Sequence, residues 1–163
     1  MARPLPSAVH DFLSQHGIAV AGVSRDGNLP AKTIYRKLKE KGYQVYAVNP
    51  RASSVEGDPC YPSLAELPGP VDALMIATPA EASLDLVRQC ADQGIRRVWM
   101  HRSIGPCSVS EGAVELCHEL GIEVIPGGCP MMHLEPVDVA HRCMRWVLGF
   151  AGRLPEEVRQ TAA

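Results

Sequence analysis

Short, mainly apolar segments alternate with amphipathic ones along the whole chain. The apolar segments have the length of buried strands and stand at 18–21, 44–48, 73–77, 97–100 and 123–125. Between them, apolar residues recur three and four positions apart, which predicts helices at 7–16, 31–41, 80–93, about 108–120 and about 138–149. Strands that alternate with helices are typical of a parallel sheet with right-handed crossovers. We therefore predict a Rossmann-like, doubly wound α/β fold, with a five-stranded, mostly parallel sheet and helices on both faces.

Length and composition fit one compact domain. The chain has 163 residues, of which 46% are apolar and 21% are charged, and these values are ordinary for a globular protein. No linker or low-complexity stretch interrupts the sequence. We predict a single domain over residues 1–163, with its core at about 15–136, then the C-terminal helix and a tail from about Pro155.

Charge and cysteine content exclude several kinds of partner. The formal net charge of −2 gives no electrostatic case for nucleic-acid binding, which needs a basic patch. No apolar run is long enough to span a bilayer, and Met1 to Pro6 lack the core of a signal peptide. The six cysteines form no C-x-x-C pair. We expect a cytoplasmic protein with reduced cysteines and with no nucleic-acid or membrane partner.

Several predicted loops bring polar residues to one edge of the sheet. In an open α/β sheet, ligands bind beyond the carboxyl ends of the strands, near the point where strand order reverses. Gly22 lets the backbone approach a phosphate closely, Ser24 offers a hydroxyl, and Arg25, Lys32 and Arg51 add positive charge. The alternative is that Gly22 serves only a tight turn and the cations form a solvated helix face. The loops that converge there are 22–28, 48–51, 78–81, 101–105 and 127–133.

The expected ligand is a nucleotide other than NAD. A NAD site has the pattern G-x-G-x-x-G at the first turn and an acidic residue about 20 positions later, which binds the ribose hydroxyls. Here the glycine pattern is absent, and the second strand ends in Asn49-Pro50. The fold indicates a nucleotide site, whereas the loop chemistry disfavours a nicotinamide cofactor.

An ordered series of short motifs gives the ligand a more definite identity. The series is Gly22-Val23-Ser24, Val48-Asn49-Pro50, Cys60-Tyr61-Pro62-Ser63-Leu64, Pro70-Val71-Asp72, Val98-Trp99-Met100 and Gly128-Cys129-Pro130. It resembles the small bacterial CoA-binding proteins, which are similar to the N-terminal CoA-binding domain of the succinyl-CoA synthetase alpha subunit. The resemblance covers roughly residues 15–136.

This resemblance implies a Rossmann-like domain that holds coenzyme A or an acyl-CoA as its small-molecule ligand. By position, residues 22–24 would meet the phosphates, residues 48–50 would line the adenine and ribose site, and residues 76–80 would lie under the adenosine or pantetheine portion. Lys32 is a looser match, placed near the phosphates on charge grounds. The expected ligand-binding residues are Gly22, Val23, Ser24, Arg25, Lys32, Val48, Asn49, Pro50, Arg51, Ala77, Thr78, Pro79, His101 and Cys129.

Two segments depart from the simplest members of that family and leave an enzymatic alternative open. They are the loop 101–105 and the extension 131–136. Cys129 follows two glycines and precedes a proline, so it is expected at the mouth of the crevice, where a low-pKa thiol would act as a nucleophile. With His101 or His133 as base, the chain would be a small redox or acyl-transfer enzyme. The alternative is an inert, buried cysteine.

Two further alternatives concern a metal and a protein partner. Cys129, His133, His141 and Cys143 are residue types that bind zinc, but His141 and Cys143 point to different faces of a predicted helix and the spacing matches no common zinc pattern. We therefore predict no metal site. The final helix carries Trp146 on an apolar surface, which keeps a regulatory subunit or a homodimer open.

Overall fold

The described part of the chain is built around one central sheet. The computed structural model describes residues 7–26, 30–103 and 107–151. The strands, in sheet order, are β3, β4, β2, β1, β5, β6 and β7. All neighbouring pairs are parallel except β3 and β4, which are antiparallel. The bounds are β1 Gly17–Ala21, β2 Gln44–Val48, β3 Ser54–Val55, β4 Asp58–Tyr61, β5 Ala73–Ile76, β6 Arg97–Met100 and β7 Glu123–Pro126.

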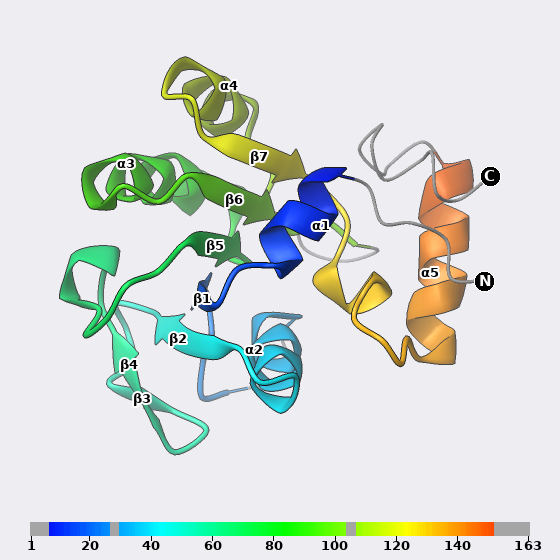
Figure 1. Ribbon diagram of the computed structural model, residues 1–163, viewed down its shortest axis with the longest axis horizontal. Coiled ribbons are helices and arrows are strands. Elements are labelled where there is room, and N and C mark those ends of the chain that lie inside the picture. The colour runs from blue at the N-terminus through cyan, green and yellow to red at the C-terminus, as the bar shows by residue number, and fades with distance from the viewer. Residues whose placement is uncertain (1–6, 27–29, 104–106, 152–163) are drawn as a thin grey trace.

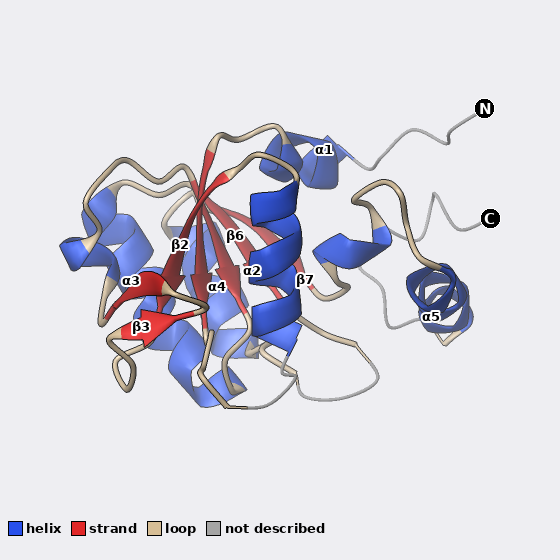
Figure 2. Cartoon of the chain, turned by 90° about the horizontal axis from the view of Figure 1, so that it is seen from below, coloured by secondary structure: helices blue, strands red, loops and turns tan. Residues whose placement is uncertain are grey.

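Helices cover both faces of this sheet, as Figures 1 and 2 show. On one face, α1, α2 and the short 3-10 helix η3 form a core with Val20 and Trp99. On the other face, α3 and α4 pack against Leu74 and Val98. The fold class predicted from the sequence is confirmed. The bounds are α1 Ser7–Leu13, α2 Pro30–Glu40, α3 Ser83–Gln93, α4 Glu111–Glu119 and α5 Val139–Phe150, with short 3-10 helices η1 Leu64–Glu66, η2 Ala80–Ala82 and η3 Pro130–Met132.

The central strands are continuous apolar runs because both of their faces are buried. In β1, Ile18 and Val20 belong to the core under α2, whereas Ala19 and Ala21 belong to the core under α3. All five residues of this strand are buried. Alternate side chains of a strand point to opposite faces, so a strand covered on both sides needs apolar residues at every position.

The sheet has seven strands where the sequence predicted five. The two extra strands, β3 and β4, form a hairpin from a segment that reads as a polar loop. Its turn residues, Glu56 and Gly57, both have positive φ, at 55° and 84°, as a type I′ hairpin turn requires. Only Val55 and Cys60 of this hairpin are buried. An edge hairpin with two buried side chains lacks the apolar run by which the other strands are found.

The last helix, α5, lies outside the two main layers and contacts η3 (Figure 1). It falls within a residue of its predicted bounds. Val139, Trp146, Val147 and Phe150 are exposed, and the Trp146 and Phe150 rings meet edge to face at 4.7 Å between centroids. The homodimer through this surface stays a prediction. The predicted tail from Pro155 lies outside the described residues. Within the described ranges, no helix combines the length and apolar character needed to cross a membrane.

Candidate functional site

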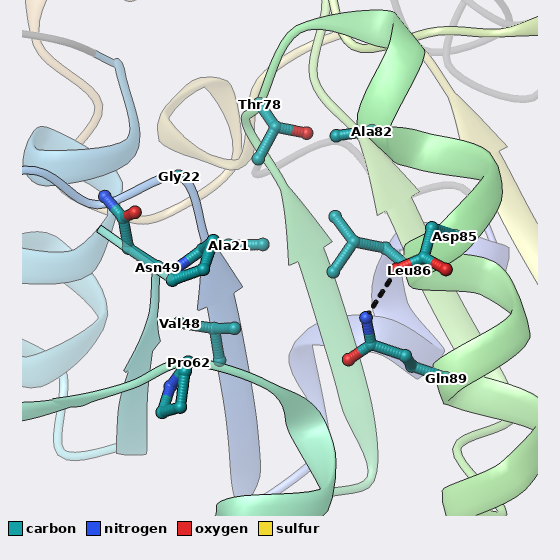
Figure 3. Close-up of a pocket in the computed structure, with 11 residues that line it drawn as sticks. Ala21, Gly22, Val48, Asn49, Pro62, Thr78, Ala82, Asp85, Leu86 and Gln89 are labelled. Carbon is teal, nitrogen blue, oxygen red and sulfur yellow. Dashed lines mark hydrogen bonds between the residues drawn. The ribbon is translucent and has the colours of Figure 1, made fainter. Parts of the chain in front are cut away.

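A cleft opens at the centre of the sheet, at the carboxyl ends of β1 and β5. From β1, the chain adds β2 on one side of the sheet, and it later adds β5 and then β6 on the other side of β1. Strand order therefore reverses between β1 and β5. The cleft has a volume of about 880 Å³. A second pocket of about 270 Å³ adjoins it toward α3 and is drawn in Figure 3. The residues that line both are Gly22, Asn49, Pro50, Thr78 and Ala82.

Gly22 brings the backbones after β1 and β5 into direct contact. Its φ is +98°, a value that L side chains rarely adopt. A Cβ at this position would lie 2.6 Å from the carbonyl oxygen of Ala77 and 2.9 Å from its carbon. The Gly22 N–H donates to the carbonyl of Val48 at 3.0 Å. Backbone of the two loops therefore meets at the floor of the cleft, which Gly22 and Ala77 both line.

Asn49 holds the loops after β1 and β2 together. Its Nδ2 donates to the carbonyl of Val23 at 2.8 Å, and its Oδ1 accepts from the N–H of Arg51 at 2.9 Å. Its own N–H donates to the carbonyl of Tyr61 at 2.8 Å. This side chain is thus committed to the backbone. It adds no negative charge where a NAD site presents a carboxylate to the ribose.

Two of the three expected cations line the cleft. The Arg25 guanidinium donates from Nε to the Ser54 carbonyl at 3.3 Å and from Nη2 to the Ser53 hydroxyl at 3.4 Å. Arg51 is exposed, and no hydrogen bond or ion pair of its guanidinium is recorded within the described ranges. The two guanidinium groups line the cleft together with Ser24 and Ser53 and make this end suitable for phosphate oxygens.

The third cation, Lys32, supports the loop from behind. Its Nζ lies 2.8 Å from Oε1 of Glu56 and donates to the carbonyl of Arg25 at 3.3 Å. Glu56 also accepts a hydrogen bond from Arg36, and the bonds from Arg36 and Lys32 lower the pKa of its carboxyl to about 2. Lys32 is not among the residues that line the cleft. Its charge is balanced by Glu56, and it fixes the backbone that carries Arg25.

Thr78 carries a buried hydroxyl that has no partner among the described residues. Figure 3 shows this side chain at the rim of the smaller pocket. The Thr78 backbone is held in place because its carbonyl accepts from the Ser108 hydroxyl, and the Ser108 carbonyl in turn accepts from the buried Ser83 hydroxyl at 2.6 Å. A buried polar atom without a partner costs about 1–3 kcal/mol.

The smaller pocket has apolar walls and a polar rim. Ala21, Val48 and Leu86 are buried wall residues, and Figure 3 shows the Leu86 side chain extending from α3 into the space. We did not predict from the sequence that side chains of α3 line this pocket. The signal was present as the helical spacing 82, 85, 86 and 89 within the predicted helix 80–93. Asp26 and Glu81 line the cleft from the predicted loops 22–28 and 78–81, although neither was named as a ligand residue. The lining residues missed from the sequence are Ala21, Ala52, Ser53, Pro62, Ala82, Asp85, Leu86 and Gln89.

The expectation that Cys129 stands at the mouth of the crevice was wrong, and the alternative of an inert, buried cysteine fits the structure. Its side chain is only 3% exposed and belongs to the core with Trp99 and Met132, and burial raises the pKa of its thiol to about 12. Gly127 and Gly128 before it have φ of 132° and 73°, and the packing of η3 into the same core places the thiol inside the protein. A neutral, buried thiol is the opposite of an activated nucleophile.

His101 and Val23 also lie away from the open cleft. His101 is 2% exposed, and its backbone N–H donates to the carbonyl of Ile76 at 2.9 Å. Val23 is fully buried on the α2 face, so only its backbone faces the first loop. Part of the predicted loop 101–105 lies outside the described residues, as do the last two residues of the loop 22–28. The remaining expected residues that line the two spaces are Gly22, Ser24, Arg25, Val48, Asn49, Pro50, Arg51, Ala77, Thr78 and Pro79.

The four residues considered as zinc ligands are not brought together. Cys129 and His133 are buried, Cys143 is exposed, and the His141 ring Nδ1 lies 2.6 Å from Oδ2 of Asp138. Over the described ranges of the chain, no three His, Cys, Asp or Glu side chains form a group that could hold a metal ion.

The burial of Cys129 predicts slow chemical labelling. In the native protein, we expect the exposed Cys143 to react with iodoacetamide at least about tenfold faster than Cys129, because a buried thiol reacts only when the structure opens locally. Timed alkylation followed by peptide mass spectrometry measures both rates. In strong denaturant the two rates should become similar. Native labelling of Cys129 as fast as that of Cys143 would show that its thiol reaches solvent.

His133 is a second buried polar group in the same region. It is 6% exposed, and neither ring nitrogen has a hydrogen-bond partner among the described residues. Its ring lies 6.0 Å from that of Trp99. Burial lowers the pKa of its imidazole to about 4, and the positive charge of Arg145 adds to this effect. The folded protein therefore holds His133 neutral.

This neutral histidine predicts a loss of stability in acid. The unfolded chain takes up a proton near pH 6.5, whereas the folded chain does so only near pH 4. The free energy of unfolding should fall by about 3 kcal/mol across that window. Urea unfolding at pH 7 and pH 4.5 measures it. We expect His133→Leu to lose most of this pH dependence and His118→Asn, a change at an exposed site on α4, to keep it; an unchanged dependence in His133→Leu would contradict the assignment.

Comparison with known proteins identifies relatives of this chain. Residues 16–135 match the family model described as CoA binding domain. The chain is 31% identical over 125 residues to the subunit alpha of an ADP-forming acetate–CoA ligase II from Pyrococcus furiosus. That alignment covers 72% of this chain and 27% of the relative, so this chain spans about a quarter of the relative's length.

Solved structures share the fold. A hypothetical protein from Pyrococcus horikoshii superposes with a TM-score of 0.73 at 24% identity, over 84% of this chain and 99% of that one. An acetyl-coenzyme A synthetase 1 from Ca. Korarchaeum cryptofilum, described as dinucleotide forming and in complex with phosphate and ADP, gives a TM-score of 0.62 at 27% identity. The latter match covers 75% of this chain and 27% of that one.

Proposed function

Because this chain belongs to the CoA binding domain family, we propose that it binds coenzyme A or an acyl-CoA in the cleft at the carboxyl ends of β1 and β5. The observation that carries the proposal is the backbone floor at Gly22, flanked by two guanidinium groups. A phosphate-rich ligand complements each of these features. When bound, coenzyme A supplies a thiol that can carry an acyl group.

The polar end of the cleft would take the phosphates. Gly22 and Ser24 line this end of the cleft, and the backbone of residues 22–24 would meet the phosphates there. Arg25 is held by Ser53 and Ser54, so its charge is fixed in position before a ligand arrives. Such preorganisation lowers the entropy lost on binding. Arg51 follows the end of β2, where dinucleotide folds that bind a ribose phosphate have an arginine.

The smaller pocket would take the adenosine portion. It is lined mainly by apolar side chains and has about 270 Å³, slightly below the roughly 300–1,000 Å³ of sites for whole drug-sized ligands. A single base with its ribose suits this size better than complete coenzyme A. The pantetheine arm would then follow Ala77, Thr78 and Pro79 along the larger cleft.

Two alternatives have less support. A NAD site would present a carboxylate at the end of β2, but Asn49 stands there with both side-chain polar atoms bonded to backbone. A thiol-dependent enzyme that uses Cys129 would need an accessible, ionisable sulfur, and the Cys129 thiol is buried with its pKa raised.

Isothermal titration calorimetry with coenzyme A, acetyl-CoA, NAD and NADP tests the proposal. We expect coenzyme A and acetyl-CoA to bind with dissociation constants well below about 1 mM, and NAD to bind at least about tenfold more weakly, because two arginines line the cleft and Asn49, not a carboxylate, follows β2. Tighter binding of NAD than of coenzyme A would overturn it.

A further inference from the structure

The smaller pocket carries two polar side chains whose orientation is fixed. Asp85 and Gln89 stand one turn apart on α3, at the rim of a space whose walls include Val48 and Leu86 (Figure 3). Nε2 of Gln89 donates to Oδ2 of Asp85 at 2.8 Å. Oε1 of Gln89 accepts from the backbone N–H of Leu64 at 3.1 Å. A backbone N–H can only donate, so it determines which end of the Gln89 amide is oxygen.

These bonds leave a defined set of free positions at the rim. Gln89 has two amide hydrogens and uses one on Asp85, so one N–H remains for a ligand. The Asp85 carboxylate only accepts hydrogen bonds and has lone pairs to spare. The rim thus presents one acceptor next to one donor. Its acceptor is charged, which strengthens a bond to an N–H and penalises a ligand oxygen at the same place.

We propose that Asp85 and Gln89 select adenine over 6-oxopurines in this pocket, with Asp85 accepting from the exocyclic amine and Gln89 donating to a ring nitrogen. The inference rests on the proposed function, because it assumes that the base of coenzyme A enters this pocket. Adenine presents an amine donor at C6 beside the acceptors N1 and N7. An acceptor and a donor side by side match either of these edges.

The same geometry rejects hypoxanthine and guanine. Both carry an oxygen at C6, so a base seated in the orientation of adenine puts that oxygen against the Asp85 carboxylate. Their N1–H can reach Asp85 only if the base turns over, which the proposed ribose and phosphate positions in the larger cleft oppose. A well-matched pair of side-chain contacts to a base is worth about 1–3 kcal/mol of discrimination, or roughly 5- to 150-fold. The apolar walls contribute to every purine alike. Discrimination therefore depends on the two rim residues, while total affinity depends on the walls and phosphates.

Calorimetry with adenosine 3′,5′-bisphosphate and inosine 3′,5′-bisphosphate tests the inference, because these probes differ in the base alone. For the wild-type protein, we expect the adenosine probe to bind at least about tenfold more tightly. Asp85→Asn places an amide in the same space, and its N–H₂ can donate to the C6 oxygen. We expect this variant to lose the preference to within about twofold or to favour the inosine probe.

Asp92→Asn is the matched control, because Asp92 is an exposed residue on the same helix and does not line the pocket. It should keep the wild-type preference and coenzyme A affinity. Equal binding of the two probes to wild type, or an unchanged preference in Asp85→Asn, would overturn the inference while leaving coenzyme A binding intact. Absence of both coenzyme A and bisphosphate binding in wild type would instead overturn the proposed function on which it rests.

Discussion

Replacing Gly22 by alanine is expected to destabilise the protein by about 3 kcal/mol or more and to abolish coenzyme A binding. Two costs add at this position. The φ of +98° is unfavourable for a residue with a Cβ, and the new Cβ would lie 2.6 Å from the Ala77 carbonyl oxygen, which requires the loops after β1 and β5 to move apart. Those loops form the floor of the cleft. Urea unfolding and calorimetry with coenzyme A measure the two effects.

Gly42→Ala separates these costs. Gly42 follows α2 with φ +86°, and nothing lies within 4 Å of an added Cβ. This variant carries the conformational cost of about 1 kcal/mol without the clash, and it should bind coenzyme A normally. If Gly22→Ala were no less stable than Gly42→Ala and bound coenzyme A as wild type does, the close approach of the two loops would not matter for the site.

Arg51→Glu is expected to weaken coenzyme A binding about 10- to 100-fold, the range that corresponds to loss of a charged hydrogen bond. Arg51 lines the cleft next to the end of β2, and its guanidinium has no recorded partner within the described ranges, so it is available to a ligand phosphate. Dephospho-CoA lacks the ribose phosphate. The affinity for dephospho-CoA should therefore differ by less than about threefold between Arg51→Glu and wild type. Calorimetry with both ligands measures the difference.

The charge-matched control is Arg88→Glu, at an exposed position of α3 outside both spaces. It makes the same change in net charge and should leave both affinities within about twofold of wild type. Equal losses for coenzyme A and dephospho-CoA in Arg51→Glu would show that Arg51 acts through the general field of the cleft and not through the ribose phosphate.

The central part of the site could be predicted because its determinants are local in sequence. Buried parallel strands are continuous apolar runs, and the loop after each one is placed at the same edge of the sheet by the topology. The positions of Gly22 and Asn49 at the site follow directly from that rule, because each residue comes just after a buried strand. The β3 and β4 hairpin could not be found in this way, because β4 is placed by its pairing with β2 and only Val55 and Cys60 of the hairpin are buried.

Two other features depend on packing that sequence does not reveal. Cys129 follows a Gly-Gly turn, and such a turn is compatible with an exposed or a buried thiol. The thiol is buried because η3 packs against Trp99 and α2. Asp85 and Gln89 share a helical face with Leu86, but polar side chains at the edge of an apolar face do not by themselves indicate a pocket. Their role at the pocket rim follows from the position of α3 beside the ends of β1 and β2 and from the N–H of Leu64.

A crystal structure of the protein with coenzyme A tests the central claim most directly. The account predicts the pyrophosphate within hydrogen-bond distance of the backbone of residues 22–24, a ligand phosphate next to Arg51, and the adenine in the pocket between Val48 and Leu86. Coenzyme A bound elsewhere, for example on the exposed face of α5, or bound with its adenine away from α3, would contradict it.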